Sequence, residues 1–439
     1  MKNKLNTILA NDIDTKNEIK NFYPLTTKFD RDYKVFSFEE VIGLFVATLT
    51  NKNSQKFNAE TFKERCLRVC EQKMDDPSYI HIIEKKYFAS GKLVLDSMLT
   101  YQTYTPSMNS ERVFFKVFEQ MLDCTKVDID FETESNFLDK IIINELHKHL
   151  EDKNYTQSTS SYLPFLDKLF NTDLQNLSKN RHYFKQNIEK FFELYFFLYS
   201  SQLALNLHPI QNALSVPKAQ ELYFILNHEK ASKERTKVED RGYKNLREKV
   251  KYIFPYLSLL TDLAKAADNQ DLRLYQLNEL IGDDANAIAA VDHFRAELRI
   301  ARKLPLQENS QSECIDIALK RLLETSFEQF KKGNIVDRQR ALTQFISAFE
   351  RQIAQPFIVN RRRAGIVLVL DQDTLLLLTN LCIGAEEKVR FQTLMKSFQD
   401  RGVYFDTRSQ AELISLFERI GNIERKSDSG DAVYVKSTI

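Results

Sequence analysis

The chain is poor in glycine, with only ten glycines in 439 residues. Five of them fall in the last 75 residues: Gly365, Gly384, Gly402, Gly421 and Gly430. Because glycine is common in turns, the long stretch before these five glycines has few turn signals and predicts long helices. The C-terminal region instead predicts short elements separated by sharp turns.

Cysteine is rare as well, and the chain has almost no excess of charge of either sign. Five scattered cysteines exclude a disulfide framework and agree with a reducing compartment. Cys66 and Cys70 follow helical spacing with Phe62, which predicts burial of both thiols rather than a metal site. Lys plus Arg total 62 against 61 acidic residues, so any contact with DNA must come from a local patch.

Long apolar runs are also missing. The runs LYFFLY and VLVL are too short to cross a bilayer, and the N-terminus lacks the apolar core and cleavage site of a signal peptide. We therefore expect a cytoplasmic protein with no membrane partner. At 439 residues the chain exceeds the size at which one hydrophobic core usually stops growing, so two or three domains are expected.

Helical patterns fill the first two expected domains. Residues 1–230 predict a helical N-terminal domain, in which FKQNIEKFFELYFFLYSSQLALN, from Phe184, has the all-round aromatic pattern of a buried helix. Residues 231–358 predict a charged connector and a second helical region. The stretch 228–251 holds nine Lys or Arg against five acidic residues, which indicates either a solvated helix or linker, or a surface that faces phosphates.

The third expected domain, residues 359–439, combines helices with short strands. The predicted elements are a strand at 366–370, helices at 371–384, 386–402 and 407–421, a brief extended run at 403–406, and a hairpin of 423–426 and 432–435 around a turn at 427–431. This order is typical of a winged helix-turn-helix. The expected fold class is thus mainly α, with a long multi-helix body and a C-terminal winged helix-turn-helix domain.

Each of the three C-terminal helices has signals for its ends. The expected N-terminal signals are Asp371 or Asp373 as the first cap, Glu386 and Glu387 in the first turn of the second helix, and Thr407 or Ser409 as the third cap. Gly384, Gly402 and Gly421 are expected to end the helices.

The third helix and two basic runs supply candidate contacts to DNA or to a protein partner. Outward positions on the helix are expected for Arg408, Ser409, Gln410, Glu412 and Arg419, above buried Leu413, Leu416, Phe417 and Ile420. Arg425 and Lys426 should point to opposite faces of the first hairpin strand. The candidate contact residues are Arg361, Arg362, Arg363, Arg408, Ser409, Gln410, Arg419, Arg425 and Lys426. With 12 basic and 11 acidic residues in 361–439, DNA binding and protein docking both stay open.

No catalytic, cofactor or metal site is predicted. VLVLDQDT resembles the opening of haloacid dehalogenase-type phosphatases, but the 66 residues after Asp373 are too few for the doubly wound domain they need. Gly91 and Lys92 lack the other residues of a phosphate-binding loop. A nuclease metal set of Asp373, Glu386 and Lys388 competes with simple helix capping. We therefore expect a protein that is not an enzyme.

The C-terminal sequence resembles a known family. The run RRRAGIVLVLDQDTLLLLTNLCIG, continued by RGVYFDTRSQAELISLFERIGNIERKSDSGDAVYVKSTI, is similar to the end of DptG. That family forms a subunit of bacterial DNA phosphorothioation-dependent restriction systems. The resemblance covers about the last 80 residues and carries no catalytic motif. It implies work against foreign DNA together with DptF and DptH, the helicase-like ATPase chemistry residing in a sister subunit.

The expected function is that of a non-catalytic subunit of such a restriction complex in antiviral defence. Its winged helix would support assembly, or engage double-stranded DNA directly or through the complex. A free-standing winged-helix DNA-binding regulator is the alternative, and an enzyme with an unrecognised site is the third possibility. Neighbouring genes for sulfur transfer and a helicase would favour the first.

Overall fold

The computed structural model describes residues 7, 10–19, 23, 25, 37–53, 58–74, 76–89, 93–95, 97–104, 109–131, 136–152, 161–230, 235–266, 272–305, 307, 311–331, 336–426 and 432–438. Helices dominate it, as predicted. Within these residues, no helix combines the length and apolar character that a membrane span requires.

The chain divides into two compact units. Unit 1 comprises Met1–Tyr33, Ser161–Leu169 and Glu193–Thr438, and unit 2 comprises Lys34–Ser160 and Phe170–Phe192, with Ile439. Both domain boundaries expected from the sequence, at 230 and 358, lie inside unit 1. Two of the passages of the chain from one unit to the other fall within helices, α7 (Pro164–Ser178) and α8 (Arg181–Asn206). As predicted, aromatic side chains of α8 are buried, among them Phe191, Tyr195 and Tyr199.

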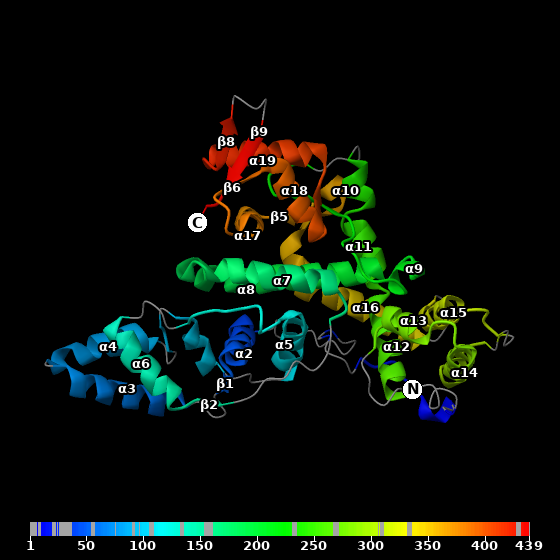
Figure 1. Ribbon diagram of the computed structural model, residues 1–439, viewed down its shortest axis with the longest axis horizontal. Coiled ribbons are helices and arrows are strands. Elements are labelled where there is room, and N and C mark those ends of the chain that lie inside the picture. The colour runs from blue at the N-terminus through cyan, green and yellow to red at the C-terminus, as the bar shows by residue number, and fades with distance from the viewer. Residues whose placement is uncertain are drawn as a thin grey trace. The chain divides into compact units, whose positions relative to one another are not determined.

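Unit 2 is built mainly from short helices (Figure 1). Aromatic side chains pack between them. Its further elements are α2 (Phe38–Thr50), β1 (Lys52–Asn53), α3 (Ala59–Lys73), α4 (Ile80–Tyr87), α5 (Asn109–Met121), α6 (Phe137–His147) and β2 (Glu151–Asp152). Phe192 lies at its centre, with ring centroids 5.2 Å from Phe45 and 4.4 Å from Phe118. Cys66 and Cys70 are fully buried, so their predicted burial is confirmed.

Unit 1 contains a second set of helices between residues 210 and 354. These are α9 (Ile210–Ala213), α10 (Thr236–Asp240), α11 (Tyr243–Val250), α12 (Ile253–Ala266), α13 (Leu274–Ile281), α14 (Ala285–Ala301), α15 (Ile315–Glu328) and α16 (Val336–Phe349), which a π-helical turn (Glu350–Ala354) extends. The basic stretch 228–251 contributes α10 and α11, which pack against strands of the same unit. Several of its cations are engaged there: Arg241 pairs with Glu221 and Arg247 with Glu350.

A four-stranded sheet joins distant segments of unit 1. β3 (Leu222–Leu226) lies between β5 (Ile366–Leu370) and β7 (Val403–Phe405) and is parallel to both, while β4 (Ile358–Asn360) pairs antiparallel with β5. All five residues of β3 are buried. A continuous apolar run is what a parallel strand covered on both faces requires. The sequence interpretation missed β3, because it assigned residues 1–230 to helices.

The C-terminal elements largely follow the predicted order. After β5 come α17 (Gln372–Ile383), β6 (Lys388–Arg390), α18 (Phe391–Asp400), β7, α19 (Thr407–Arg419), β8 (Ile423–Lys426) and β9 (Ala432–Lys436). The predicted hairpin strands pair antiparallel, and β6 adds to them in the order β6-β9-β8. The expected turn at 427–431, with Gly430, lies outside the described residues.

The start of the second C-terminal helix was predicted wrongly. Glu386 and Glu387 do not lie in its first turn, because Lys388–Arg390 pairs with β9 and α18 begins only at Phe391. The first cap is confirmed: Asp371 accepts a hydrogen bond from the Thr374 N–H at 2.7 Å. The third cap is Asp406, not Thr407 or Ser409.

Candidate functional site

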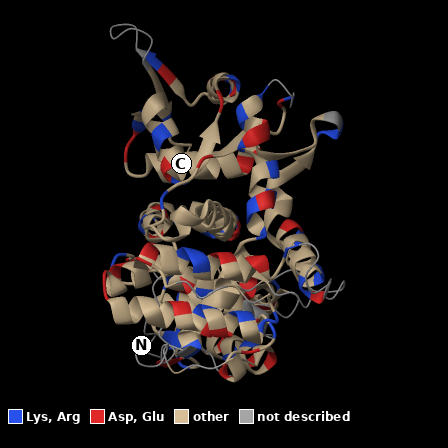
Figure 2. Ribbon diagram, turned by 90° about the vertical axis from the view of Figure 1, so that its right-hand side faces the viewer, with Lys and Arg blue, Asp and Glu red and all other residues tan. Residues whose placement is uncertain are grey.

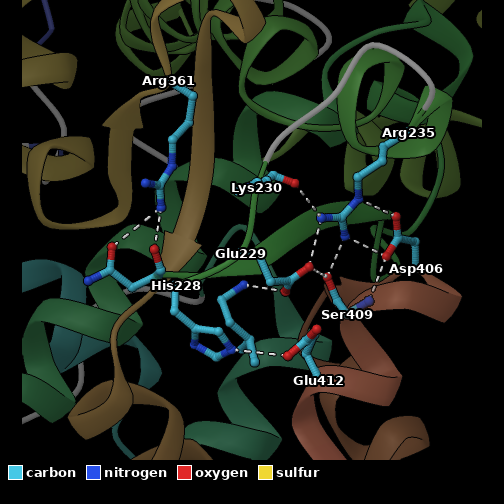
Figure 3. A network of polar contacts seen from close by, with 10 residues as sticks. His228, Glu229, Lys230, Arg235, Arg361, Asp406, Ser409 and Glu412 are labelled. Carbon is cyan, nitrogen blue, oxygen red and sulfur yellow. Dashed lines mark hydrogen bonds and ion pairs between the residues drawn. The ribbon is translucent and has the colours of Figure 1, made fainter.

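The carboxyl ends of two parallel strands bring polar residues together in unit 1. β3 is followed by Asn227, His228 and Glu229, and β7 is followed by Asp406, the cap of α19. Parallel strands end at the same edge of a sheet, which is why segments far apart in sequence meet here. Figure 3 shows Glu229, Asp406 and Ser409 around the guanidinium of Arg235, which enters from the connection between β3 and α10.

Arg235 is bound on all sides. Its Nε and Nη2 donate to the two carboxylate oxygens of Asp406 at 2.8 and 2.6 Å, and its Nη1 donates to Glu229 Oε2 at 2.7 Å. Its Nη2 also donates to Ser409 Oγ at 2.6 Å. Such a two-bond guanidinium–carboxylate pair has a fixed geometry. The contacts therefore hold the start of α19 against the end of β3.

Burial gives this Arg235 network its electrostatic character. The side chains of Arg235 and Glu229 are 5% and 1% exposed. Burial alone raises the pKa of Asp406, but hydrogen bonds from Arg235 and from the Ser409 N–H outweigh it and leave that pKa lowered. The pKa of Arg235 is raised, since its two carboxylate partners outweigh the opposing effect of burial. Asp406 and Arg235 therefore both stay charged at neutral pH, and their paired charges make the network a structural anchor.

Ser409 corrects one expected contact. The residue is fully buried rather than outward, because Asp406 begins the helix and turns Ser409 toward the Arg235 network. Its hydroxyl accepts from Arg235 and donates to Glu229 Oε2 at 3.0 Å. Gln410 is half-buried and donates to the Phe405 carbonyl oxygen at 2.9 Å. Arg408 and Arg419 are exposed, as predicted.

The predicted run of three arginines is divided by the fold. Arg361 turns toward the sheet edge, where its Nη2 donates to the carbonyl oxygen of Asn227, as Figure 3 shows. Arg362 is exposed and has a φ of 54°. The side chain of Arg363 lies outside the described residues. The run therefore does not present three equivalent cations to a ligand.

The hairpin candidates also differ from each other. Arg425 is exposed and pairs with Glu418 of α19 through its Nε and Nη2. A neighbouring carboxylate offsets the charge that it would offer to a phosphate. The Lys426 side chain lies outside the described residues, and the backbone of Lys426 pairs with Ala432.

The sequence interpretation missed a basic surface on the three-stranded sheet. In the register of the strands, Lys388 lies opposite Lys436, and Arg390 lies opposite Tyr434. Glu424 lies opposite Tyr434 on the other side. Directly paired residues share one face of a sheet. We call these five residues the basic sheet face; it holds three cations and one carboxylate around a tyrosine.

Glu424 holds two of these cations in place. Its carboxylate lies 2.7 Å from Lys388 Nζ and 3.1 Å from Lys436 Nζ. These hydrogen bonds, first from Lys388 and then from Lys436, lower the pKa of Glu424 to about 2. Arg390 Nε donates to the Tyr434 hydroxyl at 3.3 Å and remains exposed. The alternation Lys-Val-Arg at 388–390 is the signal that could have revealed β6.

This surface is chemically suited to binding anions. Elsewhere, basic and acidic residues are interspersed along the helices of each unit (Figure 2). Among the described residues, no group of three or more His, Cys, Asp or Glu side chains is arranged to hold a metal ion. No protein-family model matches the sequence, and no curated protein matches it significantly.

Proposed function

We propose that residues 372–436 form a winged-helix module whose basic sheet face binds the phosphate backbone of DNA. The observation that carries this proposal is the order α17, β6, α18, α19, β8, β9, together with the sheet order β6-β9-β8. A helix, a strand, two helices and a hairpin, with the first strand paired to the last, is the winged-helix arrangement. This chain adds β7 between α18 and α19 and ties it to β3.

Charge favours the sheet over the third helix as the DNA contact. Exposed Arg408 and Arg419 share α19 with Glu412 and Glu418. On the basic sheet face, Lys388, Arg390 and Lys436 accompany the single carboxylate of Glu424, which leaves an excess of two positive charges. Clustered cations bind a polyanion by releasing its counterions, and such contacts position a protein without reading sequence.

We further propose that the chain is a non-catalytic subunit of a phosphorothioation-dependent restriction complex. The similarity of its C-terminal 80 or so residues to DptG supports this, and it makes DptF and DptH the partners. The Arg235 network adds a physical reason, because it mounts α19 rigidly on the rest of unit 1. A rigid connection suits a DNA-binding module that must hold the rest of its complex in a fixed position on the DNA.

DNA binding is tested with a triple variant, Lys388→Gln, Arg390→Gln and Lys436→Gln, in the full chain. Fluorescence anisotropy with a labelled duplex over a salt series should show weaker binding for all sequences. The slope of log affinity against log salt should flatten by about 0.9 for each phosphate that the variant no longer neutralises. Lys396→Gln is the matched control, since Lys396 is exposed on α18 and pairs with Asp400.

Two results would overturn the proposal. An unchanged salt slope in the triple variant, with loss of binding in Arg408→Gln and Arg419→Gln, would move the DNA-binding surface to α19. Failure to co-purify with DptF and DptH from the native operon would contradict the proposed restriction complex. Tight, sequence-specific binding by the chain alone would instead indicate a regulator.

A further inference from the structure

A cavity of about 870 Å³ opens among the helices of unit 1. Its walls come from α12, α14, α15 and α16, of which α15 packs against both α12 and α14 (Figure 1). Small-molecule sites in proteins typically measure about 300–1,000 Å³. None of its lining residues belongs to the Arg235 network or to the basic sheet face, so it is a separate feature of the molecule.

Arg295 lines this cavity as a buried cation with an unmatched donor. The residue is 5% exposed, and its Nε meets no hydrogen-bond acceptor in the part of the chain that the structure describes. Burial lowers the pKa of Arg295, and Arg321 and Arg299 lower it further against the opposing effects of Asp292 and Glu324. An arginine nevertheless stays charged. A buried charge that is incompletely paired is costly, which points to an anion that completes the site.

The nearby carboxylates are largely engaged elsewhere. Asp292 accepts hydrogen bonds from Ser312 N at 2.7 Å and from Ser312 Oγ at 2.8 Å. Glu328 pairs with Arg299 at 2.7 Å. Glu324 is exposed. Four cations line the cavity against two carboxylates: Lys251, Arg295, Arg321 and Lys331 against Glu324 and Glu328.

Flat rings form another part of the lining. His208 and Tyr252 stack with ring centroids 4.6 Å apart and an angle of 13° between the rings. Phe327 follows, with its centroid 4.7 Å from that of Tyr252. Burial, then Lys249 and Lys251, lower the pKa of His208, so the imidazole is neutral and its Nδ1 accepts from Lys249 Nζ at 2.8 Å.

We propose that this cavity binds a nucleotide, with its phosphate on Arg295 and Arg321 and its base against Tyr252 and Phe327. The fork of a guanidinium matches the oxygens of a phosphate, and a buried guanidinium holds them strongly. Aromatic rings stack on any nucleobase. A free phosphate would leave most of the volume and the ring wall unused. This inference does not depend on the proposed function.

Calorimetric titration of the full chain with AMP, GMP, CMP and UMP tests the proposal. At least one should bind with one site per chain. Its nucleoside and ribose 5-phosphate should each bind roughly tenfold or more weakly, because each lacks one half of the interaction. Absence of binding by all four at millimolar concentration would overturn the proposal. Equal binding of ribose 5-phosphate would also overturn it, since the rings would then play no part.

Melting measurements on Arg295→Gln separate binding from structure. The variant should melt at a higher temperature than wild type without ligand, because it removes an uncompensated buried charge. It should also lose the rise in melting temperature that the nucleotide produces in wild type. Arg340→Gln, exposed on α16, is the matched control and should change neither. A lower melting temperature with nucleotide binding retained would make Arg295 structural and overturn the proposal.

A second variant tests the proposal independently, in case Arg295→Gln does not fold. Tyr252→Leu keeps the cations and removes a ring, and should weaken nucleotide binding about tenfold. Unchanged affinity in Tyr252→Leu would contradict the assigned position of the base.

Discussion

Arg235 and Asp406, 171 residues apart in sequence, form a largely buried pair in which Nε and Nη2 of Arg235 donate to both carboxylate oxygens of Asp406. The pair stands at the start of α19 and at the end of the connection from β3. It therefore couples the C-terminal helices to an earlier part of the chain by a directed contact.

Removing Arg235 should destabilise the protein strongly. Arg235→Gln leaves buried Glu229 and half-buried Asp406 without their cation, and breaking a buried ion pair typically costs about 3–5 kcal/mol of unfolding free energy. The control is Arg241→Gln, whose ion pair with Glu221 is exposed. Its change should stay below about 1 kcal/mol. Urea denaturation measures both, and equal small losses would show that the network is not an anchor.

Gly402 should tolerate substitution less well than Gly421. Both glycines follow a helix and have a positive φ, 81° at Gly402 and 77° at Gly421. Alanine in this conformation costs about 1–2 kcal/mol of unfolding free energy. At Gly402 a Cβ would also lie 2.0 Å from Gln202 Nε2, whereas at Gly421 nothing lies within 4 Å. Gln202 is fully buried and exchanges hydrogen bonds with the Gln220 backbone.

We therefore expect Gly402→Ala to lower the unfolding free energy by roughly 1–3 kcal/mol more than Gly421→Ala. Denaturant unfolding of the two variants side by side measures the difference. Equal losses would mean that Gln202 moves aside freely.

The Asp167 carboxyl should make stability depend on pH. Burial raises its pKa to about 7, against the effects of Ser161 and Arg273. The unfolded chain releases this proton near pH 4. Between these values the folded state holds a proton that the unfolded state has released, so stability falls as the pH rises from about 4 to 7.

Asp167→Asn should therefore flatten the decrease in melting temperature between pH 5 and pH 7.5. Asp262, whose pKa burial raises to about 6, leaves a smaller slope of the same sign. Thermal melts across this range measure the effect. An unaltered slope in the variant would assign the pH dependence to other groups.

Substituting Arg425 should first affect stability, through the loss of its ion pair with Glu418. Arg425→Glu places two carboxylates together, and at these exposures the destabilisation should stay within about 1 kcal/mol. The exchanged pair, Arg425→Glu with Glu418→Arg, should recover the stability of the wild type in denaturant unfolding. If restriction activity disappears in the single variant and does not return in the exchanged pair, Arg425 contacts a partner directly.

Sequence reasoning succeeded where the signals are local. Asp371 precedes an apolar run and caps α17, and the glycines at 384, 402 and 421 end their helices. The hairpin strands predicted at 423–426 and 432–435 follow from extended or β-prone residues on either side of turn residues, within 13 positions of chain. Such elements depend on neighbours in sequence, so the order of the C-terminal elements could be predicted almost completely.

Most of the errors share one physical cause, which is pairing over long distances; the third cap, expected at Thr407 or Ser409 and found at the adjacent Asp406, is a local error. LYFIL at 222–226 has the apolar character of a helix core or of a buried strand, and only β5 and β7 decide between them. Glu386 and Glu387 resemble a helix start until β9 draws Lys388–Arg390 into a sheet. Ser409 was expected to be exposed because no residue near it in sequence indicates its hydrogen bond with Arg235.

The central position of β3 also has a consequence for how the chain folds during its synthesis. Its five buried residues leave the ribosome about 140 residues ahead of their partners in β5, an interval of roughly 7–30 seconds at about 5–20 residues per second. β7 arrives later still. Through that interval an apolar strand with two open edges awaits its neighbours, which is a condition that favours chaperone engagement. The nascent chain is thus expected to depend on chaperones most strongly while its middle third has emerged and its C-terminal strands have not.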